Sequence, residues 1–306
     1  MNEIFKCALL TLLMSVSSLA ISQEDSLRTN EDNLQPAEEI KLSNYYTLLS
    51  AGLTHPLFRD FATSPLFYDG LGINLNASWL RRAENRERIF MIDFGISGHA
   101  ARVPKSDFIQ PGAMAIFGTF SLFYQQLWKL EVLSNSKNNT KIGGAVVLTQ
   151  NVRANPSLQN NTMGLENFSN LMATVQWTRD VSRTQTKQLN LWLIKPVFKP
   201  VKRDLRILFN LGVLNFNYRP GYAYTYDSEI QGMETSPVTW AFSNYKWSLN
   251  GYRFRTQVEY VKYLPNGNAR SWSYLWESAH APGKHEPFQM ASHRIQYTIY
   301  FHTKKR

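Results

Sequence analysis

The chain has almost no cysteine and comparatively little negative charge. Its one cysteine, Cys7, lies among the first residues, so disulfide scaffolds and thiolate zinc sites are excluded from the rest of the chain. Only 23 residues are acidic against 33 lysines and arginines, which gives the 306 residues a formal net charge of +10. Glycine and proline are too sparse for a fibrous protein, whereas an aromatic content of 13% is too high for a disordered one. A folded, basic and aromatic-rich protein remains.

The first 22 residues have the composition of an export signal. Lys6 precedes an apolar run from Cys7 to Met14, and small, weakly polar residues follow. This order is typical of a secretory signal peptide, with cleavage expected after Ala20 or Ser22. The apolar run is too short to span a bilayer, which needs ~20 residues. Because Cys7 precedes the apolar run instead of standing at a cleavage point, we expect no lipid anchor.

Residues 23–42 form a separate, acidic segment with six acidic and two basic residues, a local charge of −4. Its low apolar content predicts a flexible tail. Glu3 and Lys6 cancel within the signal segment, so removing this −4 from the total of +10 leaves +14 for residues 43–306. The folded part is therefore more basic than the whole chain suggests.

The remaining chain, 43–306, contains no long helical stripe and no further long apolar run. Apolar residues instead recur at every second position, clearly so in 71–80, 89–97, 170–177, 205–213 and 294–301. Such alternation is typical of strands with one apolar and one polar face. The segments are ~9 to 14 residues long, enough to cross a membrane at a tilt, whereas the strands of a soluble β-sandwich are shorter. The sequence therefore predicts an all-β fold, an antiparallel transmembrane β-barrel of about 12 strands, within a range of roughly 10 to 14.

Aromatic residues recur near the ends of these segments, where the interfacial girdles of a barrel are expected. They are Trp79, Trp128, Trp177, Tyr218, Trp240, Tyr263 and Trp276. If the N-terminus lies in the periplasm, long outer loops alternate with short inner turns. The outer loops are then expected at 53–70, 99–112, 152–167 and 280–291, and the inner turns at 82–88, 179–187 and 265–268. The stretch 219–237 is long where this scheme predicts a short turn.

Asn250-Gly251 separates two alternating runs, 240–249 and 252–264. This dipeptide predicts a two-residue hairpin, since both central residues of such a turn need positive φ. The hairpin would place Lys246 opposite Arg255 on the inner face. A following turn of three residues would place Glu277 diagonal to Arg255.

Charged residues of both signs are expected on the inner face of the barrel. They are Lys246, Arg253, Arg255, Glu259, Glu277, Arg206 and Arg294, together with Asp93. They predict a salt-bridge cluster in the lumen or, alternatively, a cationic constriction that selects anions. Leu208, Met172 and Leu275 on the same face indicate a partly plugged interior.

A basic run, 195–206, contains Lys199, Lys202 and Arg203. If the run is extracellular, these three residues are candidates for contacts with lipopolysaccharide phosphates. If it is periplasmic, they are candidates for contacts with an acidic partner. Nucleic-acid binding is not expected, because the chain carries an export signal and contains no nucleic-acid-binding module.

The histidines give little support to catalysis. Outer-membrane phospholipases and lipid A deacylases pair serine and histidine at close spacing such as His-x-Ser, and none of the six histidines has a serine two residues later. The cluster from His280 to Glu286 offers few metal ligands, all on a loop. We therefore expect no catalytic residue, metal or cofactor, and a lipid hydrolase remains a remote alternative.

The chain resembles outer-membrane barrels of the Bacteroidota over its whole length, in its signal peptide, acidic N-terminal segment, Asn- and Tyr-rich strands and final aromatic strand. It departs from them at its C-terminus, where five residues follow Phe301. The resemblance implies the outer membrane of a Gram-negative bacterium, insertion by the barrel-assembly machinery, and contact with outer-membrane lipid and lipopolysaccharide. The expected role is a structural or accessory subunit that binds envelope partners; the alternative is a narrow, porin-like channel for small, anionic solutes.

Overall fold

The computed structural model describes residues 45–61, 64–102, 113–157, 163–188, 197–198, 200–220, 245–281 and 287–303. The strands are β1 (Tyr45–Asp60), β2 (Ser64–Arg82), β3 (Arg86–Arg102), β4 (Met114–Lys129), β5 (Asn138–Ala154), β6 (Met163–Asp180), β7 (Lys187–Gln188), β8 (Val197–Phe198), β9 (Arg203–Pro220), β10 (Tyr245–Ser248), β11 (Tyr252–Tyr263), β12 (Ala269–Ala281) and β13 (Phe288–His302). A short 3-10 helix, η1, covers Glu131–Leu133. No helix in these ranges is long and apolar enough to cross a membrane.

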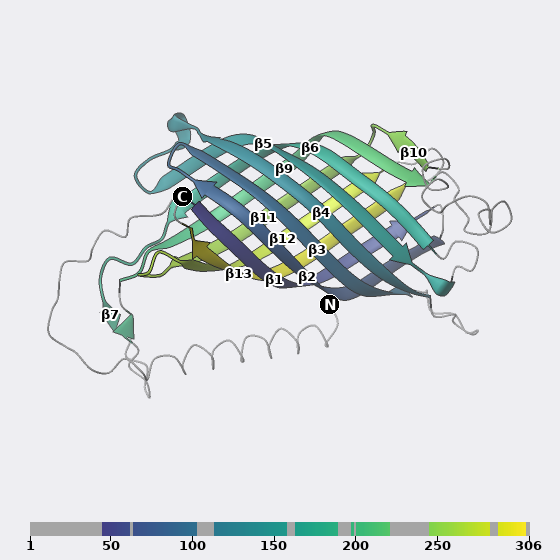
Figure 1. Cartoon of the computed structure of the whole chain (residues 1–306), viewed down its shortest axis with the longest axis horizontal. Helices are drawn as coiled ribbons and strands as arrows, with labels where there is room; N and C mark the ends of the chain where they lie inside the picture. Colours follow the sequence, from purple (N-terminus) through teal and green to yellow (C-terminus); the bar gives the residue numbers. More distant parts are fainter. Residues whose placement is uncertain are drawn as a thin grey trace. The chain divides into compact units, whose positions relative to one another are not determined.

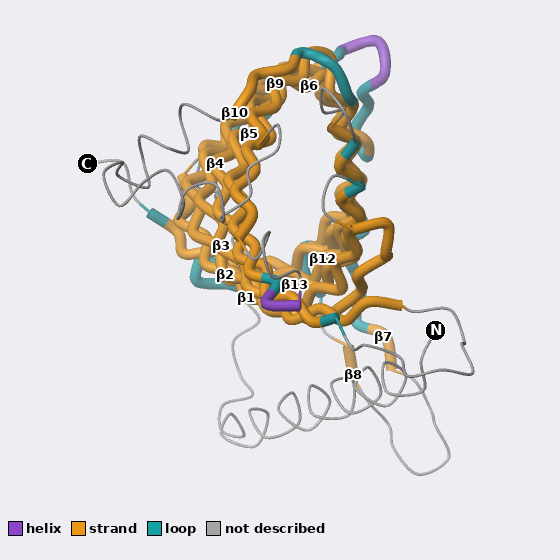
Figure 2. Tube along the Cα trace, turned by 90° about the vertical axis from the view of Figure 1, so that its right-hand side faces the viewer, coloured by secondary structure: helices purple, strands orange, loops and turns teal. Residues whose placement is uncertain are grey.

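The long strands form one antiparallel sheet that closes on itself (Figures 1 and 2). Each strand from β1 to β6 pairs with the next, and β6 pairs with β9. From β9 the order continues through β11, β12 and β13, and β13 pairs with β1 along almost its full length. Closure leaves neither β1 nor β13 as a free edge, so the predicted all-β antiparallel barrel is confirmed.

The expected hairpin at Asn250-Gly251 is wrong. β10 and β11 both pair with β9 and run in the same direction along it, with Ser248 opposite Asn217 and Phe254 opposite Leu211. The two runs are therefore two parts of one strand, interrupted around Gly251. Gly251 has a positive φ of 115°, and this backbone conformation occurs at the interruption and not in a turn that reverses the chain.

The asparagines of β9 hold the interruption in place. Asn217 donates a side-chain hydrogen bond to the carbonyl of Asn250 at 2.6 Å, and Asn215 donates one to the carbonyl of Gly251 at 2.7 Å. Both face this point because β9 contains a bulge. Its pairing with β6 shifts at Leu171 and Met172, and leaves Val213 as an extra residue.

Merging β10 with β11 also corrects the strand number. The run 188–198 contributes within its described part only the two-residue pair of β7 and β8. The described barrel therefore has ten strand positions, the lower limit of the expected range and not twelve.

With ten strands, the connections sort into two ends of the barrel. At the terminal end, where β1 begins and β13 ends, connections follow β2, β4, β6 and β11. At the loop end, connections follow β1, β3, β5, β9 and β12. The segment between β9 and β10, puzzling under a twelve-strand count, thus belongs to the loop end with the expected outer loops.

The expected outer loop 53–70 is wrong. Its described residues are mostly strand, with Leu57 opposite Asp69 and Phe58 opposite Tyr68. Pro56, which has no N–H group to donate to the ladder, and Gly70 hid this alternation in the sequence. Consistent with this, no pairing with β2 occurs at the two residues between Thr54 and Leu57.

Alternation of the two strand faces is confirmed in most of the described strands. In β2, for example, Leu71, Ile73 and Leu75 are exposed on the outside, whereas Asn74 and Asn76 are buried on the inside. The outer surface is consequently apolar, whereas the inner surface combines the buried polar and charged side chains with three apolar clusters. Tyr263, expected in an outer girdle, instead points inward and is almost fully buried.

Candidate functional site: the interior of the barrel

The interior of the barrel gathers most of the buried charge of the described chain. Seven arginines point inward: Arg82, Arg153, Arg206, Arg219, Arg253, Arg255 and Arg294. Inward-facing acids accompany them at three levels along the barrel.

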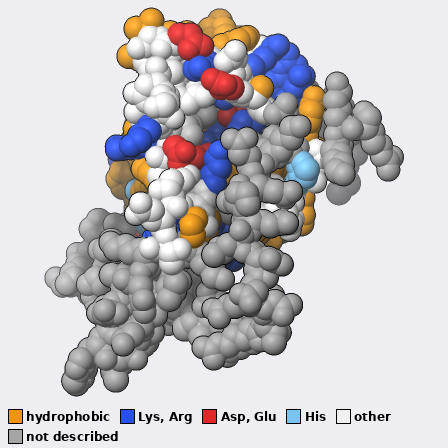
Figure 3. Space-filling model, turned by 90° about the vertical axis from the view of Figure 1, so that its left-hand side faces the viewer, with side chains coloured by type: hydrophobic (Ala, Val, Ile, Leu, Met, Phe, Trp, Pro, Cys, Tyr) orange, Lys and Arg blue, Asp and Glu red, His pale blue; other side chains and the backbone are white. Residues whose placement is uncertain are grey.

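The terminal end opens into a vestibule, a cavity of about 420 Å³. Its charged lining residues are Arg82, Glu84, Glu87, Lys129, Lys137, Lys141, Asp180, Lys202, Asp204 and Arg206. Figure 3 views the molecule from this end and shows basic and acidic side chains intermingled on the visible surface. The vestibule is thus a mixed-charge, water-accessible hollow and not a uniformly basic one.

The rim of the vestibule contains a simple surface pair. Glu84, in the turn after β2, accepts a hydrogen bond from the Lys129 ammonium at 2.9 Å. This bond holds the pKa of the fully exposed Glu84 carboxyl below its usual value. Lys129 also pairs with Glu131 at 3.1 Å.

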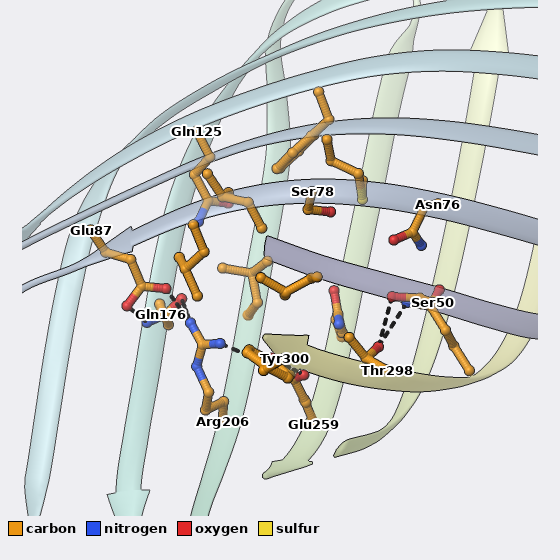
Figure 4. Close-up of a pocket in the computed structure, with 18 of the residues that line it drawn as sticks. Ser50, Asn76, Ser78, Glu87, Gln125, Gln176, Arg206, Glu259, Thr298 and Tyr300 are labelled. Atoms are coloured by element: carbon orange, nitrogen blue, oxygen red, sulfur yellow. Dashed lines mark hydrogen bonds and ion pairs between the residues drawn. The ribbon is translucent and has the colours of Figure 1, made fainter. Parts of the chain in front are cut away.

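Glu87 and Arg206 form the floor of the vestibule and the first level of ion pairs. Arg206 on β9 reaches across the lumen to the carboxylate of Glu87 on β3, four strand positions away. Arg82 and Lys141 approach the same carboxylate, each at 3.4 Å. Four ionised groups therefore meet at this level, and Figure 4 shows two of them, Glu87 and Arg206, pointing toward each other.

Glu259 extends this level towards β13. It pairs with Arg206 at 3.1 Å and accepts hydrogen bonds from Ser271 at 2.6 Å and Tyr300 at 2.5 Å. Tyr263 donates to Asp204 at 2.7 Å and accepts from Arg82 at the same distance. Both tyrosine hydroxyls thus bind carboxylates inside the barrel.

A central cavity of about 70 Å³ lies beyond this floor. Glu87 and Arg206 line both the cavity and the vestibule, so their ion pair separates the two spaces. The walls of the cavity combine polar side chains with apolar ones such as Met91 and Phe123. Figure 4 shows Ser50 bonded to Thr298 there, at 2.9 Å between hydroxyl oxygens. Arg255 also lines it.

The second level of ion pairs lies deeper in the barrel. Arg294 on β13 binds Asp93 on β3 at 2.8 Å. Arg253 on β11 binds one oxygen of Glu277 through two of its nitrogens, at 2.6 and 2.5 Å. Arg253 also donates to Asn170 at 3.1 Å and so connects β11 with β6.

The third level lies at the loop end. Asp60 on β1 binds Arg153 on β5 at 2.7 Å and Arg219 on β9 at 3.0 Å, through different oxygens. Glu166, fully buried, lies 3.2 Å from Arg153. Aromatic rings pack around these ions. The rings belong to one buried apolar cluster and are those of Phe58, Tyr68, Phe117, Phe168 and Phe288.

The structure brings six of the seven expected lumen residues to the inner face: Arg206, Arg253, Arg255, Glu259, Glu277 and Arg294. They do not form one cluster but belong to two levels. Glu277 lies directly opposite Arg255 in the ladder, not diagonal to it, yet its ion pair is with Arg253. The backbone of Lys246 lies opposite Arg219 instead of Arg255, because no hairpin forms.

The basic run 195–206 lies at the terminal end in its described part. Lys202 lines the vestibule, with its ammonium 5.8 Å from the centre of the Tyr263 ring. Arg203 donates to the hydroxyl of Tyr260 on the outer face at 3.0 Å. Lys199 lies outside the described residues. The lipopolysaccharide contacts expected of these residues stay a prediction.

Sequence reasoning missed two groups of residues. The loop-end ions Asp60, Arg153 and Arg219 lie at strand ends that were assigned to loops. Ser97 and His99 are bonded at 2.9 Å, through the spacing Ser-x-His instead of His-x-Ser. Both are buried beside Phe58 and Phe117, and neither lines the two cavities described above.

The sequence predicted that the cluster from His280 to Glu286 offers few ligands for a metal ion. Residues 282–286 of this cluster lie outside the described residues. Among the residues that are described, no group of three or more histidine, cysteine, aspartate or glutamate side chains could hold a metal ion. His280 is on the outer face, stacked on Tyr252 with 5.4 Å between ring centres.

No family model matches the chain, and no curated protein matches it in sequence. Solved structures with a similar fold include the outer membrane protease OmpT from Escherichia coli, at 6% identity and a TM-score of 0.46 over 87% of this chain and 98% of that one. The translocator domain of the autotransporter NalP from Neisseria meningitidis matches at 10% identity and a TM-score of 0.32, over 95% and 97%. Ail of Yersinia pestis matches at 7% and 0.26, over 84% and 99%. Similarities this low transfer no activity to the present chain.

Proposed function

We propose that this chain is an integral outer-membrane β-barrel of a Gram-negative bacterium, with a lumen closed by ion pairs, that serves as a structural or accessory subunit of the cell envelope. The observation that carries the proposal is the set of ion pairs that cross the lumen at three levels. The cross-lumen links are Arg206 to Glu87, Arg294 to Asp93, and both Arg153 and Arg219 to Asp60.

The outer surface supports the membrane location. Exposed, outward-facing apolar side chains occur on every long strand, which a water-soluble barrel would not tolerate. The 16 residues of β1 span roughly 37 Å at a rise of ~3.3 Å per residue and a tilt of ~45°, more than the ~25 Å apolar band of such barrels. Closure satisfies the backbone within the bilayer, where no water is present to do so.

The interior supports a closed barrel over an open pore. The central cavity has room for only a few water molecules, since one water needs ~10 to 15 Å³ in the same measure. Glu87 and Arg206 separate it from the vestibule, and the ions and aromatic rings around Asp60 close the other end. A solute would have to break several buried ion pairs to pass.

A closed barrel leaves its two ends for partners, because its sides face lipid. At the terminal end the vestibule offers Lys137 and Lys202, neither of which has an ion pair among the described residues. The acids beside them are already bound: Asp204 by Tyr263, and Asp180 by the backbone N–H of Ser182 at 2.7 Å. An acidic envelope protein is the kind of partner that fits this rim.

Two measurements test the proposal. The full chain, expressed with its N-terminal segment, should sediment with outer-membrane vesicles and migrate differently on a gel with and without boiling. Proteoliposomes of the purified protein should retain small sugars and amino acids as well as empty liposomes do. Recovery as a soluble protein would refute the location, and rapid solute efflux would refute the closed lumen.

A narrow channel for small anions is the second candidate. It is favoured by one observation: the vestibule and the central cavity adjoin, with basic side chains on both. Efflux that favours anions over cations of equal size would support it over the accessory role. Efflux without charge preference would support neither the constriction nor the closed barrel.

A further inference from the structure

Arg255 differs from the other inward-facing arginines. Each of the other six has a carboxylate within 3.4 Å. The guanidinium of Arg255 makes no hydrogen bond or ion pair within the described part of the chain; its recorded contact is with the ring of Phe123, 4.8 Å from the ring centre. Yet Arg255 is only 8% exposed, and its Nε is buried without a partner.

The nearest acid in the ladder forms no direct ion pair with Arg255. Glu277 lies directly opposite it, but the hydrogen bonds of that carboxylate go to Arg253. Asp93 is likewise bound, to Arg294 and Asn74. At this level three arginines therefore face two acids, which leaves one positive charge in excess.

A buried charge without a partner is costly, so a site of this kind normally recruits a counter-ion. The central cavity of about 70 Å³, which Arg255 lines, provides the space for one. Asn76 also lines it, and its side-chain Nδ2 is buried without a hydrogen-bond partner. The cavity thus presents a guanidinium and an amide donor, both without protein acceptors.

We propose that the central cavity binds a small monovalent inorganic anion, of the size of chloride, between Arg255 and Asn76. The volume suits such an ion with a few waters and is too small for a sugar phosphate or a nucleotide. Access leads from the vestibule past the ion pair of Glu87 and Arg206, which both spaces share. The inference does not depend on whether the barrel is an accessory subunit or a channel.

Thermal unfolding of the detergent-solubilised full chain tests this at constant ionic strength, with chloride exchanged for gluconate. For the unaltered protein, each tenfold rise in chloride above the dissociation constant should raise the unfolding midpoint by about 3 °C, as for a ligand that binds only the folded state. Arg255→Gln should abolish the dependence and Arg255→Lys should retain part of it. Arg179→Gln, which removes an exposed positive charge at the end of β6, should keep it in full.

Crystals grown in bromide provide an independent readout that needs no variant. An anomalous peak within hydrogen-bond distance of the Arg255 guanidinium is expected. The proposal is overturned if the unaltered protein shows no chloride dependence, if Arg255→Gln retains all of it, or if bromide occupies only surface positions.

Discussion

Both ends of the lumen contain ion pairs between a carboxylate and arginines, but the surroundings of these pairs differ. At the loop end, Asp60 holds Arg153 and Arg219 among packed aromatic rings, and the guanidinium carbons of both arginines lie 5.5 Å from ring centres, those of Phe58 and Phe288. At the terminal end, Glu87 holds Arg206, but both residues also line the vestibule. One level therefore borders an open cavity, whereas aromatic rings surround the other.

This difference in surroundings should give the ion pairs at the two ends different free-energy costs of breaking. A dry ion pair costs much to break, because the remaining charge stays buried. An ion pair beside water costs less, since water solvates the charge that is left. The loop end is thus suited to hold the barrel closed, and the terminal end is suited to rearrange when a partner or solute enters the vestibule.

The largest effect is expected at the loop end, where Asp60→Ala leaves two buried arginines without their shared carboxylate. We expect a loss of about 3 to 5 kcal/mol in the free energy of unfolding. Urea unfolding of the refolded protein in detergent, followed by tryptophan fluorescence, measures it. A loss under about 1 kcal/mol would contradict a dry loop end.

At the terminal end, Glu87→Gln removes the carboxylate that faces Arg82, Lys141 and Arg206 but preserves its shape. We expect a loss of about 2 kcal/mol, because the vestibule hydrates the remaining cations. The same urea titration measures this loss in the free energy of unfolding. An effect equal to that of Asp60→Ala would remove the distinction between the two ends.

A smaller effect is expected where a neutral group binds a carboxylate. Tyr300→Phe deletes the hydroxyl that donates to Glu259 and should cost about 1.5 kcal/mol in unfolding free energy. Tyr260→Phe is the matched control, because its hydroxyl bonds Arg203 on the exposed outer face. Equal losses in the two variants would show that burial inside the barrel adds nothing.

The smallest effect is expected at the rim. Glu84 is fully exposed, so Glu84→Gln should leave the free energy of unfolding at neutral pH unchanged within error. Its bond to Lys129 lowers its pKa in the folded state, so any contribution is present above the usual carboxylate pKa and is lost as the pH falls through the lowered one. A comparison of the variant at pH 7 and pH 3 measures this, and a gain in relative stability of the original chain at pH 3 would contradict the assignment.

The sequence predicted the barrel because period-two alternation survives in most strands. It failed where alternation is interrupted: at Pro56, at the extra residue Val213, and at Gly251. Each of these positions changes hydrogen bonding or backbone direction without ending the strand. The Asn-Gly signal in particular identifies a positive φ but not whether the chain reverses there.

The inward-facing charges followed from strand phase alone, and so Arg206, Arg253 and Arg294 were expected inside. Their partners were not predictable, because partners such as Glu87 and Asp93 lie on strands several positions away around the barrel. Strand phase also cannot show that Glu277 binds Arg253 and leaves Arg255 without an acid. That choice depends on side-chain reach across the lumen.

The closed lumen is the central claim, and single-channel recording in a planar bilayer tests it most directly. The natively folded protein, its fold verified by gel mobility, should insert without producing current steps in molar potassium chloride. Short, rare openings should appear only after Asp60→Ala removes the loop-end closure. Reproducible, long-lived current steps from the unaltered protein would contradict the closed lumen. If those steps favoured anions and lost this preference in Arg255→Glu, the barrel would be identified as a pore.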